Sequence, residues 1–237
     1  MEKPIINQNP EETPKPKIDM QVEEELTQKI IQRKIMVDRF RFNLTPQNAL
    51  NLLAAHYAVA VRMRHGFPQF DENTNENLLQ LANYLTQKDP KFGVMMCGTC
   101  GNGKTTLLYA LQSALNQLNQ MGHFTFLSEY FQVGMEIVDA KDVVIMAKDL
   151  KAIRNLRSRS MLAIDDLGKE AAEVLDFGNA LSPVIDLLEY RYQHQLFTAI
   201  TTNLTNEEIA KKYGKRIADR FNEMLEVIIF QDITYRH

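Results

Sequence analysis

The chain has 237 residues, of which 45% are hydrophobic and 24% are charged, and its formal net charge is −3 at neutral pH. These values are typical of globular proteins and exclude a strongly basic protein that coats nucleic acid, although a local basic patch remains compatible with them. No apolar run approaches the roughly 18 residues of a membrane span, and the N-terminus has no apolar signal segment, so we expect a cytoplasmic protein.

Residues 1–25 are expected to form a disordered tail, because they hold four of the eight prolines and an acidic run. Residues 26–69 are expected to form a small helical region that binds a partner. Apolar residues recur at near-helical spacing from Leu26 to Phe40, among basic residues that suit either a partner or solvent.

A second helix is predicted to begin at Thr45-Pro46, since threonine suits an N-cap and proline the first turn, and to end near Gly66.

From residue 70 the pattern changes to alternating helices and strands. A helix is predicted over about residues 76–87, and helix-like runs separate the first four strand-like runs. The five strand-like runs are Gly93–Cys97, Phe124–Ser128, Met161–Asp165, Phe197–Thr202 and Val227–Phe230. Buried strands alternating with helices predict an α/β domain over residues 70–237, with a mostly parallel five-stranded sheet flanked by helices.

The sequence GTCGNGKT, residues 98–105, is a complete phosphate-binding loop, or P-loop, between a strand-like run and a helix-like run. Its glycines let backbone N–H groups surround phosphate oxygens, and the following helix adds its positive end. Lys104 is predicted to reach the β- and γ-phosphates of ATP, and Thr105 to bind Mg²⁺. The predicted nucleotide-binding residues are Gly98, Thr99, Gly101, Asn102, Gly103, Lys104, Thr105 and Thr106.

The same stretch holds Cys97 and Cys100 at CxxC spacing. A redox dithiol needs its first cysteine at a helix N-terminus, whereas Cys97 falls at the end of a strand. A zinc site needs further ligands, and the histidines are scattered. The phosphate-binding interpretation is therefore favoured, with Cys97 as a small buried residue and Cys100 as a variable loop position.

Three further segments, which follow the P-loop along the chain, carry residues suited to ATP hydrolysis. Asp165 and Asp166 end an apolar strand in a Walker B pattern, in which Asp165 would hold Mg²⁺ and Asp166 would polarise the attacking water. Asn203 ends another strand and suits either orientation of that water or a turn. Arg216 and Arg220 share one helix face, as surface cations or as an arginine finger that reaches a neighbouring subunit.

In this order, GTCGNGKT, LAIDDLGKE, TTNLT and YGKRIADRF…VIIFQDITYR resemble the motifs of the AAA+ ATPases, specifically the DnaC/IstB-like group of bacterial helicase loaders and transposition helpers. The resemblance covers about residues 70–237 and implies a P-loop AAA+ core. The family's finger matches Arg216, while Arg220 matches the second arginine of the motif. The short stretch after Asn203 leaves no room for a full C-terminal helical lid, and this group looks similarly truncated.

The family also binds single-stranded DNA through helices between the second strand and Walker B. In this chain that region carries basic residues, which would follow a phosphate backbone or form a solvated helix face. Nearby aspartates reduce the positive electrostatic potential of this region. The basic residues are Lys148, Lys151, Arg154, Arg157 and Arg159.

The catalytic core does not separate loaders from transposition helpers. The N-terminal part lacks a zinc-ligand set and the long charged helix typical of transposition helpers. We therefore expect a DnaC-like helicase loader or primosome-type ATPase in DNA replication, which binds Mg-ATP, a replicative helicase and its own copies. An IstB-like helper that engages a transposase is one alternative. A nucleotide-binding switch with negligible hydrolysis, acting as a partner-binding module, is another.

Overall fold

The computed structural model describes residues 18–32, 39–120, 134–171, 174–176 and 179–231. The chain divides into two compact units, residues 1–37 and 38–237. In the first unit, α1 (Met20–Gln32) is a helix on which Met20, Val22, Leu26 and Ile30 are exposed. The helix begins inside the segment that was expected to be a tail, and residues 26–32 are helical as expected.

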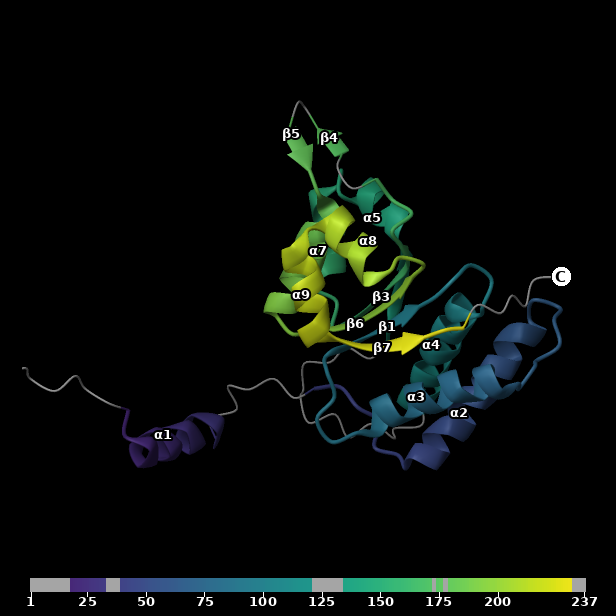
Figure 1. Ribbon diagram of the computed structural model, residues 1–237, viewed down its shortest axis with the longest axis horizontal. Helices are drawn as coiled ribbons and strands as arrows, with labels where there is room; N and C mark the ends of the chain where they lie inside the picture. The colour runs from purple at the N-terminus through teal and green to yellow at the C-terminus, as the bar shows by residue number, and fades with distance from the viewer. Residues whose placement is uncertain (1–17, 33–38, 121–133, 172–173, 177–178, 232–237) are drawn as a thin grey trace, which may run out of the picture. The chain divides into compact units, whose positions relative to one another are not determined.

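The second unit contains a parallel five-stranded sheet with the order β2-β3-β6-β1-β7 (Figure 1). Four of its strands overlap the predicted runs, and the fourth of these, β7, begins two residues before the predicted start at Val227. The strands are β2 (Glu136–Asp139), β3 (Met161–Leu167), β6 (Phe197–Thr202), β1 (Gly93–Cys97) and β7 (Leu225–Ile229). The predicted α/β class and parallel sheet are confirmed.

The strand predicted at Phe124–Ser128 lies outside the described residues. Among the described strands, β3 pairs with β6 on one side and with β2, Glu136–Asp139, on the other. The strand β2 has only four residues, EIVD, and the last of them, Asp139, caps the following helix. The strand pattern therefore cannot be separated from the helix pattern in the sequence. An additional antiparallel pair, β4 (Val174–Asp176) and β5 (Asn179–Leu181), was not expected.

Helices cover both faces of the sheet (Figure 1). One face packs against α2 (Pro46–Arg62), α3 (Glu72–Thr86) and α4 (Lys104–Gln120). The other packs against α5 (Ala140–Met146), α6 (Leu150–Arg157), α7 (Pro183–Gln193), α8 (Asn206–Tyr213) and α9 (Lys215–Met224).

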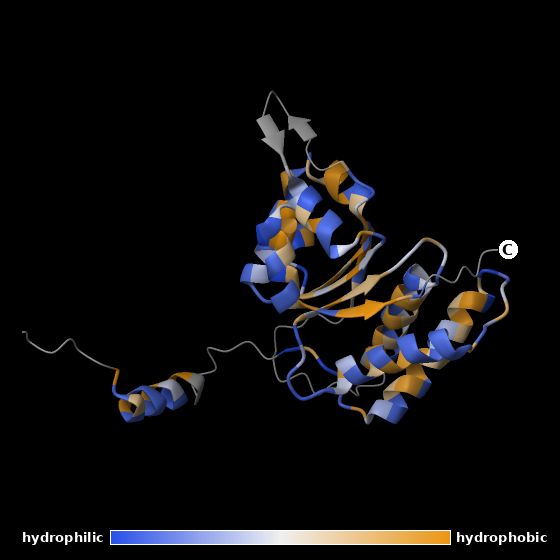
Figure 2. Ribbon diagram, viewed as in Figure 1, coloured by the Kyte–Doolittle hydropathy of each residue, from blue (hydrophilic) through white to orange (hydrophobic). Residues whose placement is uncertain are grey.

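The period-two alternation of the strands produces this layering, because successive side chains point to opposite faces. In β1, Val94 and Met96 join the core under α2–α4, while Met95 joins the core under the other helices. In Figure 2 the central strands are largely hydrophobic, whereas α2 and α3 alternate between hydrophobic and hydrophilic turns. Within the described ranges, no helix is long and apolar enough to cross a membrane.

The region predicted as a separate helical module, residues 26–69, is divided by the unit boundary. Thr45 caps α2 as predicted, accepting a hydrogen bond from the Asn48 backbone N–H, but the helix ends at Arg62, before Gly66. Leu53 and Tyr57 of α2 are buried in the same core as the sheet. The helix therefore belongs to the α/β unit, because its apolar face packs against α3 and α4, which cover the sheet.

Candidate functional site

The P-loop lies between β1 and α4, as the sequence predicts. Gly98, Gly101 and Gly103 all have φ values in the left-handed region, at 146°, 90° and 93°. At Gly98 a Cβ would lie 2.5 Å from the Phe230 carbonyl oxygen and 2.6 Å from the Asn102 side-chain amide, so only glycine fits. The loop is thereby fixed against the segment that follows β7.

Lys104 is buried inside this loop. Its ammonium donates to the carbonyl oxygens of Gly98 and Thr99, at 2.7 and 2.6 Å, and to Asn102 Oδ1 at 2.9 Å. Burial lowers the pKa of Lys104, and the nearby Asp166 carboxylate is the strongest of the charges that oppose this effect. The loop therefore holds a buried cation on neutral oxygen atoms, an arrangement suited to an incoming anion.

The carboxyl end of β3 lies next to the first turn of α4. Thr105 Oγ1 donates a hydrogen bond of 3.1 Å to Asp165 Oδ1, which also accepts one from the Thr201 hydroxyl of β6. Thr201 Oγ1 in turn accepts from the Asp166 backbone N–H at 2.8 Å. Thr201 was not predicted as a site residue, because in an apolar strand its hydroxyl carries no distinctive sequence signal.

Asp166 begins a tight turn. Its φ of 57° lies in the left-handed region, which aspartate tolerates better than most residues, and the Lys169 backbone N–H donates to its carbonyl oxygen at 3.1 Å. The Lys169 ammonium also binds the Asp166 carboxylate directly, and this bond raises the pKa of Lys169.

Glu170 anchors the end of this turn, and its side chain is fully buried. It accepts hydrogen bonds from the Gly168 N–H and the Tyr213 hydroxyl and lies 3.4 Å from the Lys212 ammonium. Burial, followed by the bond to Glu170, raises the pKa of Tyr213. Glu170 was part of the LGKE motif, but nothing in the sequence alone linked it to α8.

Asn203 directly follows β6 and is exposed at the same edge of the sheet as the P-loop, because all five strands are parallel. Arg216 and Arg220 of α9 both lie against Glu189 of α7. The Arg216 side chain is 69% exposed, whereas that of Arg220 is 19% exposed and covers the Tyr192 ring at 4.8 Å. Among the described residues, both arginines therefore share Glu189 as their ion-pair partner.

The predicted DNA-contacting residues lie on or beside α6. Lys148, Lys151 and Arg154 are exposed, and Arg157 stacks over the Tyr190 ring at 4.6 Å. Arg159 pairs with Glu136 at 2.8 Å. Three of the five basic side chains therefore face solvent, and the other two contact a tyrosine ring and a glutamate.

Cys97 and Cys100 are not joined by a disulfide bond. Burial raises the pKa of Cys97 to about 11, although the Lys104 charge opposes this shift. Because the reactive form of cysteine is the thiolate, this environment disfavours redox chemistry at Cys97 and agrees with the phosphate-binding interpretation.

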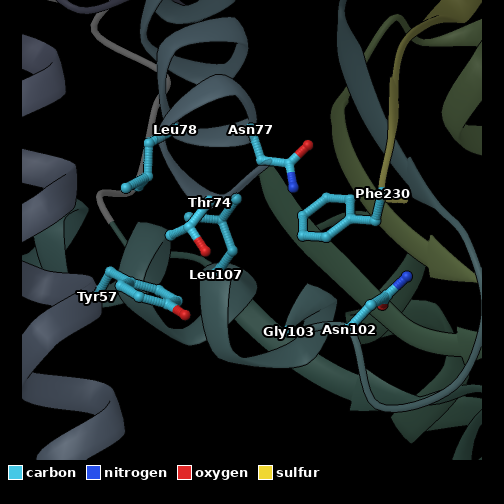
Figure 3. Close-up of a pocket in the computed structure, with 8 residues that line it drawn as sticks. All are labelled: Tyr57, Thr74, Asn77, Leu78, Asn102, Gly103, Leu107 and Phe230. Atoms are coloured by element: carbon cyan, nitrogen blue, oxygen red, sulfur yellow. The ribbon is translucent and has the colours of Figure 1, made fainter. Parts of the chain in front are cut away.

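A small cavity borders the P-loop on the side of α2 and α3. Figure 3 shows the Phe230 ring and the Asn77 amide on one side of it and Tyr57 on the other, with Gly103 at its edge. Its volume is about 10 Å³, room for one water molecule. Its walls are largely apolar with a few amide and hydroxyl groups, and at this size it is a packing cavity rather than a ligand site. The lining residues are Tyr57, Thr74, Asn77, Leu78, Asn102, Gly103, Leu107 and Phe230.

Comparison with solved structures identifies the fold. The crystal structure of the DnaC helicase loader is similar with a TM-score of 0.54 and 23% identity, over 74% of this chain and 98% of that chain. The crystal structure of DnaI is similar with a TM-score of 0.52 and 19% identity, over 83% of this chain and 96% of that chain. No protein-family model and no curated sequence matches the chain. At these identities the likeness establishes a fold like that of the DnaC helicase loader, as the motifs predicted.

Proposed function

We propose that this chain binds Mg-ATP and hydrolyses it slowly as an ATPase of the helicase-loader type, acting in DNA replication. One observation carries the proposal: Thr105 of the P-loop is hydrogen-bonded to Asp165 of β3, with Lys104 and Asp166 beside them. These four side chains supply the cation, the oxygen ligands and the base that phosphoryl transfer to water requires.

The buried Lys104 would exchange one of its neutral acceptors for a phosphate oxygen of ATP. Charge-assisted hydrogen bonds are about twice as strong as neutral ones, so this exchange favours nucleotide binding. The three glycines leave the loop's N–H groups and the first turn of α4 accessible to the remaining phosphates.

The residues present also fit Mg²⁺. Among the described residues, no three His, Cys, Asp or Glu side chains come together to hold a metal ion. A hydroxyl and one carboxylate, completed by water and phosphate oxygens, suit Mg²⁺, which retains waters and rarely uses an all-protein cage. Thr105 and Asp165 would hold the ion, which when bound neutralises charge on the β- and γ-phosphates.

Asp166 would accept the proton of the attacking water, and Asn203 would orient that water. The hydrogen bond from the Asp166 N–H to Thr201 fixes the backbone of this residue beside β6. Arg216 would serve as the finger for a neighbouring subunit, because its side chain is far more exposed than that of Arg220.

The likeness to the DnaC helicase loader supports the assignment to replication, although at 23% identity it establishes the fold alone. We infer that the present chain acts on a replicative helicase and that Lys148, Lys151, Arg154 and Arg157 form a path for single-stranded DNA. Exposed lysines and arginines at steps of three on and beside α6 support this path.

A nucleotide-binding switch with negligible hydrolysis is the second candidate function, and the Lys169–Asp166 ion pair favours it. A carboxylate bound to an ammonium is less available as a base. Such a switch would need Lys104 and Thr105 but tolerate loss of Asp166.

ATP binding and hydrolysis are tested separately. In a calorimetric titration, the wild-type chain should bind Mg-ATP and the Lys104→Ala variant should lose most of that affinity; equal affinities would refute the P-loop assignment. Asp166→Ala should retain ATP binding and lose the hydrolysis that the wild type shows. A wild type that binds ATP but shows no turnover, alone or with DNA and helicase, would support the switch instead.

A further inference from the structure

Arg64 lies beyond the end of α2 and contacts the first turn of α4. Its Nη1 donates a hydrogen bond of 3.0 Å to Thr106 Oγ1, and its guanidinium carbon lies 5.6 Å from the centre of the Tyr109 ring. Arg64 was not among the residues predicted from the sequence, because it precedes the P-loop motif by more than thirty positions and lies in a different element.

Arg64 is exposed, so water solvates its charge, but its position beside other positive charge favours an added anion. The N-terminus of a helix carries partial positive charge, and a cation beside it is unfavourable. Lys104 already places a second cation in this first turn. Within the described part of the chain, the contacts of Arg64 are a neutral hydroxyl and an aromatic ring, and neither supplies a negative charge.

We propose that Arg64 binds the α-phosphate of the nucleotide held by the P-loop. This inference rests on the proposed function. The order of residues along the loop selects the phosphate: Lys104 reaches the β- and γ-phosphates, Thr105 binds the metal between them, and N–H groups of the loop cradle the α- and β-phosphates. Thr106 follows Thr105 away from the γ-phosphate, so a guanidinium held on its hydroxyl lies on the α side.

The neighbouring cavity agrees with this direction. Leu107, the residue after Thr106, lines the cavity together with Tyr57 of α2. The cavity has room for one water and is too small for a base, so it marks only the side of α4 on which apolar groups lie. Tyr57, one of these apolar groups, and the cation suited to the α-phosphate both come from α2 and its continuation. In a nucleoside triphosphate the α-phosphate is the one attached to the nucleoside, so one ligand spans both features.

Variants that separate the charge of Arg64 from its hydrogen bond test the proposal. Arg64→Gln keeps a donor for Thr106 but removes the charge, and Arg64→Lys keeps the charge. We expect Arg64→Gln and Arg64→Ala to weaken ATP and ADP binding equally, by about tenfold, which corresponds to about 1.4 kcal/mol. Arg64→Lys should recover part of the loss. Arg62→Ala is the matched control, because Arg62 is exposed and faces another direction two residues earlier on α2.

The measurement is calorimetric titration of the full chain with Mg-ATP and with Mg-ADP, alongside thermal melting without nucleotide. A loss for ATP alone would place Arg64 at the γ-phosphate and overturn the proposal. Unchanged affinities, or Arg64→Gln binding like the wild type with Arg64→Ala merely melting earlier, would show a purely structural contact. A wild-type chain that binds neither nucleotide would instead refute the proposed function.

Discussion

Lys169 restrains the carboxylate that is expected to activate water, and the Lys169→Ala variant removes this restraint. The Lys169 ammonium binds Asp166 Oδ2 three residues earlier in the same turn. Hydrolysis requires this carboxylate to turn from the ammonium toward a water molecule, so the free energy of the ion pair adds to the barrier. We therefore expect the variant to hydrolyse ATP faster than the wild type.

The exposure of the pair limits the size of the effect. The Lys169 side chain is 43% exposed and that of Asp166 is 26% exposed. Pairs with this access to solvent contribute about 0.2–1 kcal/mol. A barrier lowered by about 1 kcal/mol raises kcat about fivefold, which is the upper bound for Lys169→Ala. Because the bond to Asp166 raises the pKa of Lys169, the restraint should persist throughout the neutral pH range.

The assay is steady-state ATP hydrolysis at saturating Mg-ATP as salt is increased. At an ionic strength of about 1 M the Debye length falls to about 3 Å, so the wild-type kcat should approach that of the variant. Lys169→Arg is the control that keeps the ion pair and should remain slow. A kcat for Lys169→Ala more than tenfold below the wild type would refute the reasoning and show that the lysine assists the reaction.

Three further predictions concern other parts of the molecule. Glu170→Ala should lower the free energy of unfolding by about 3–5 kcal/mol in urea denaturation, because it leaves the Lys212 charge without its carboxylate and the Tyr213 hydroxyl without its acceptor; a loss below about 1 kcal/mol would contradict this. Lys151→Ala with Arg154→Ala should weaken single-stranded DNA binding and reduce the slope of log K against log salt by about 1.4, and an unchanged slope in anisotropy titrations would exclude the α6 path. Leu26→Asp with Ile30→Asp, two exposed apolar residues one turn apart on α1, should abolish capture of a replicative helicase by the full chain while leaving ATP binding intact; unaffected capture would move the partner site elsewhere.

The sequence predicted the central strands and the P-loop well because their signals are local. Gly93–Cys97 is a short apolar run and Phe197–Thr202 combines apolar residues with β-branched threonines, and both strands have the predicted bounds. The P-loop needs glycines at fixed offsets, so the pattern specifies its backbone. Asp165 was placed beside Thr105 for a similarly general reason, since the carboxyl ends of parallel strands share one edge of the sheet.

The contacts that tune the site could not be predicted, because they join segments far apart in the chain. Arg64 approaches Thr106 from a connection between two helices, and Thr201 reaches Asp165 from another strand. The same limitation applies to α2. Its amphipathic pattern predicts a helix, but the pattern does not reveal that the buried face packs on α3 and α4 of the α/β unit rather than within a separate module.

The buried Glu170 connects the turn at Asp166 with α8 and, through α8, with α9. It fixes the turn that begins at Asp166 and binds Lys212 and Tyr213 at the end of α8. Only Gly214 separates α8 from α9, which carries Arg216. A shift of the Asp166 turn when nucleotide binds would therefore be passed to α9 through a charged, desolvated contact that resists extension. Under the proposed function, each subunit's own nucleotide would in this way influence the finger that it offers to its neighbour.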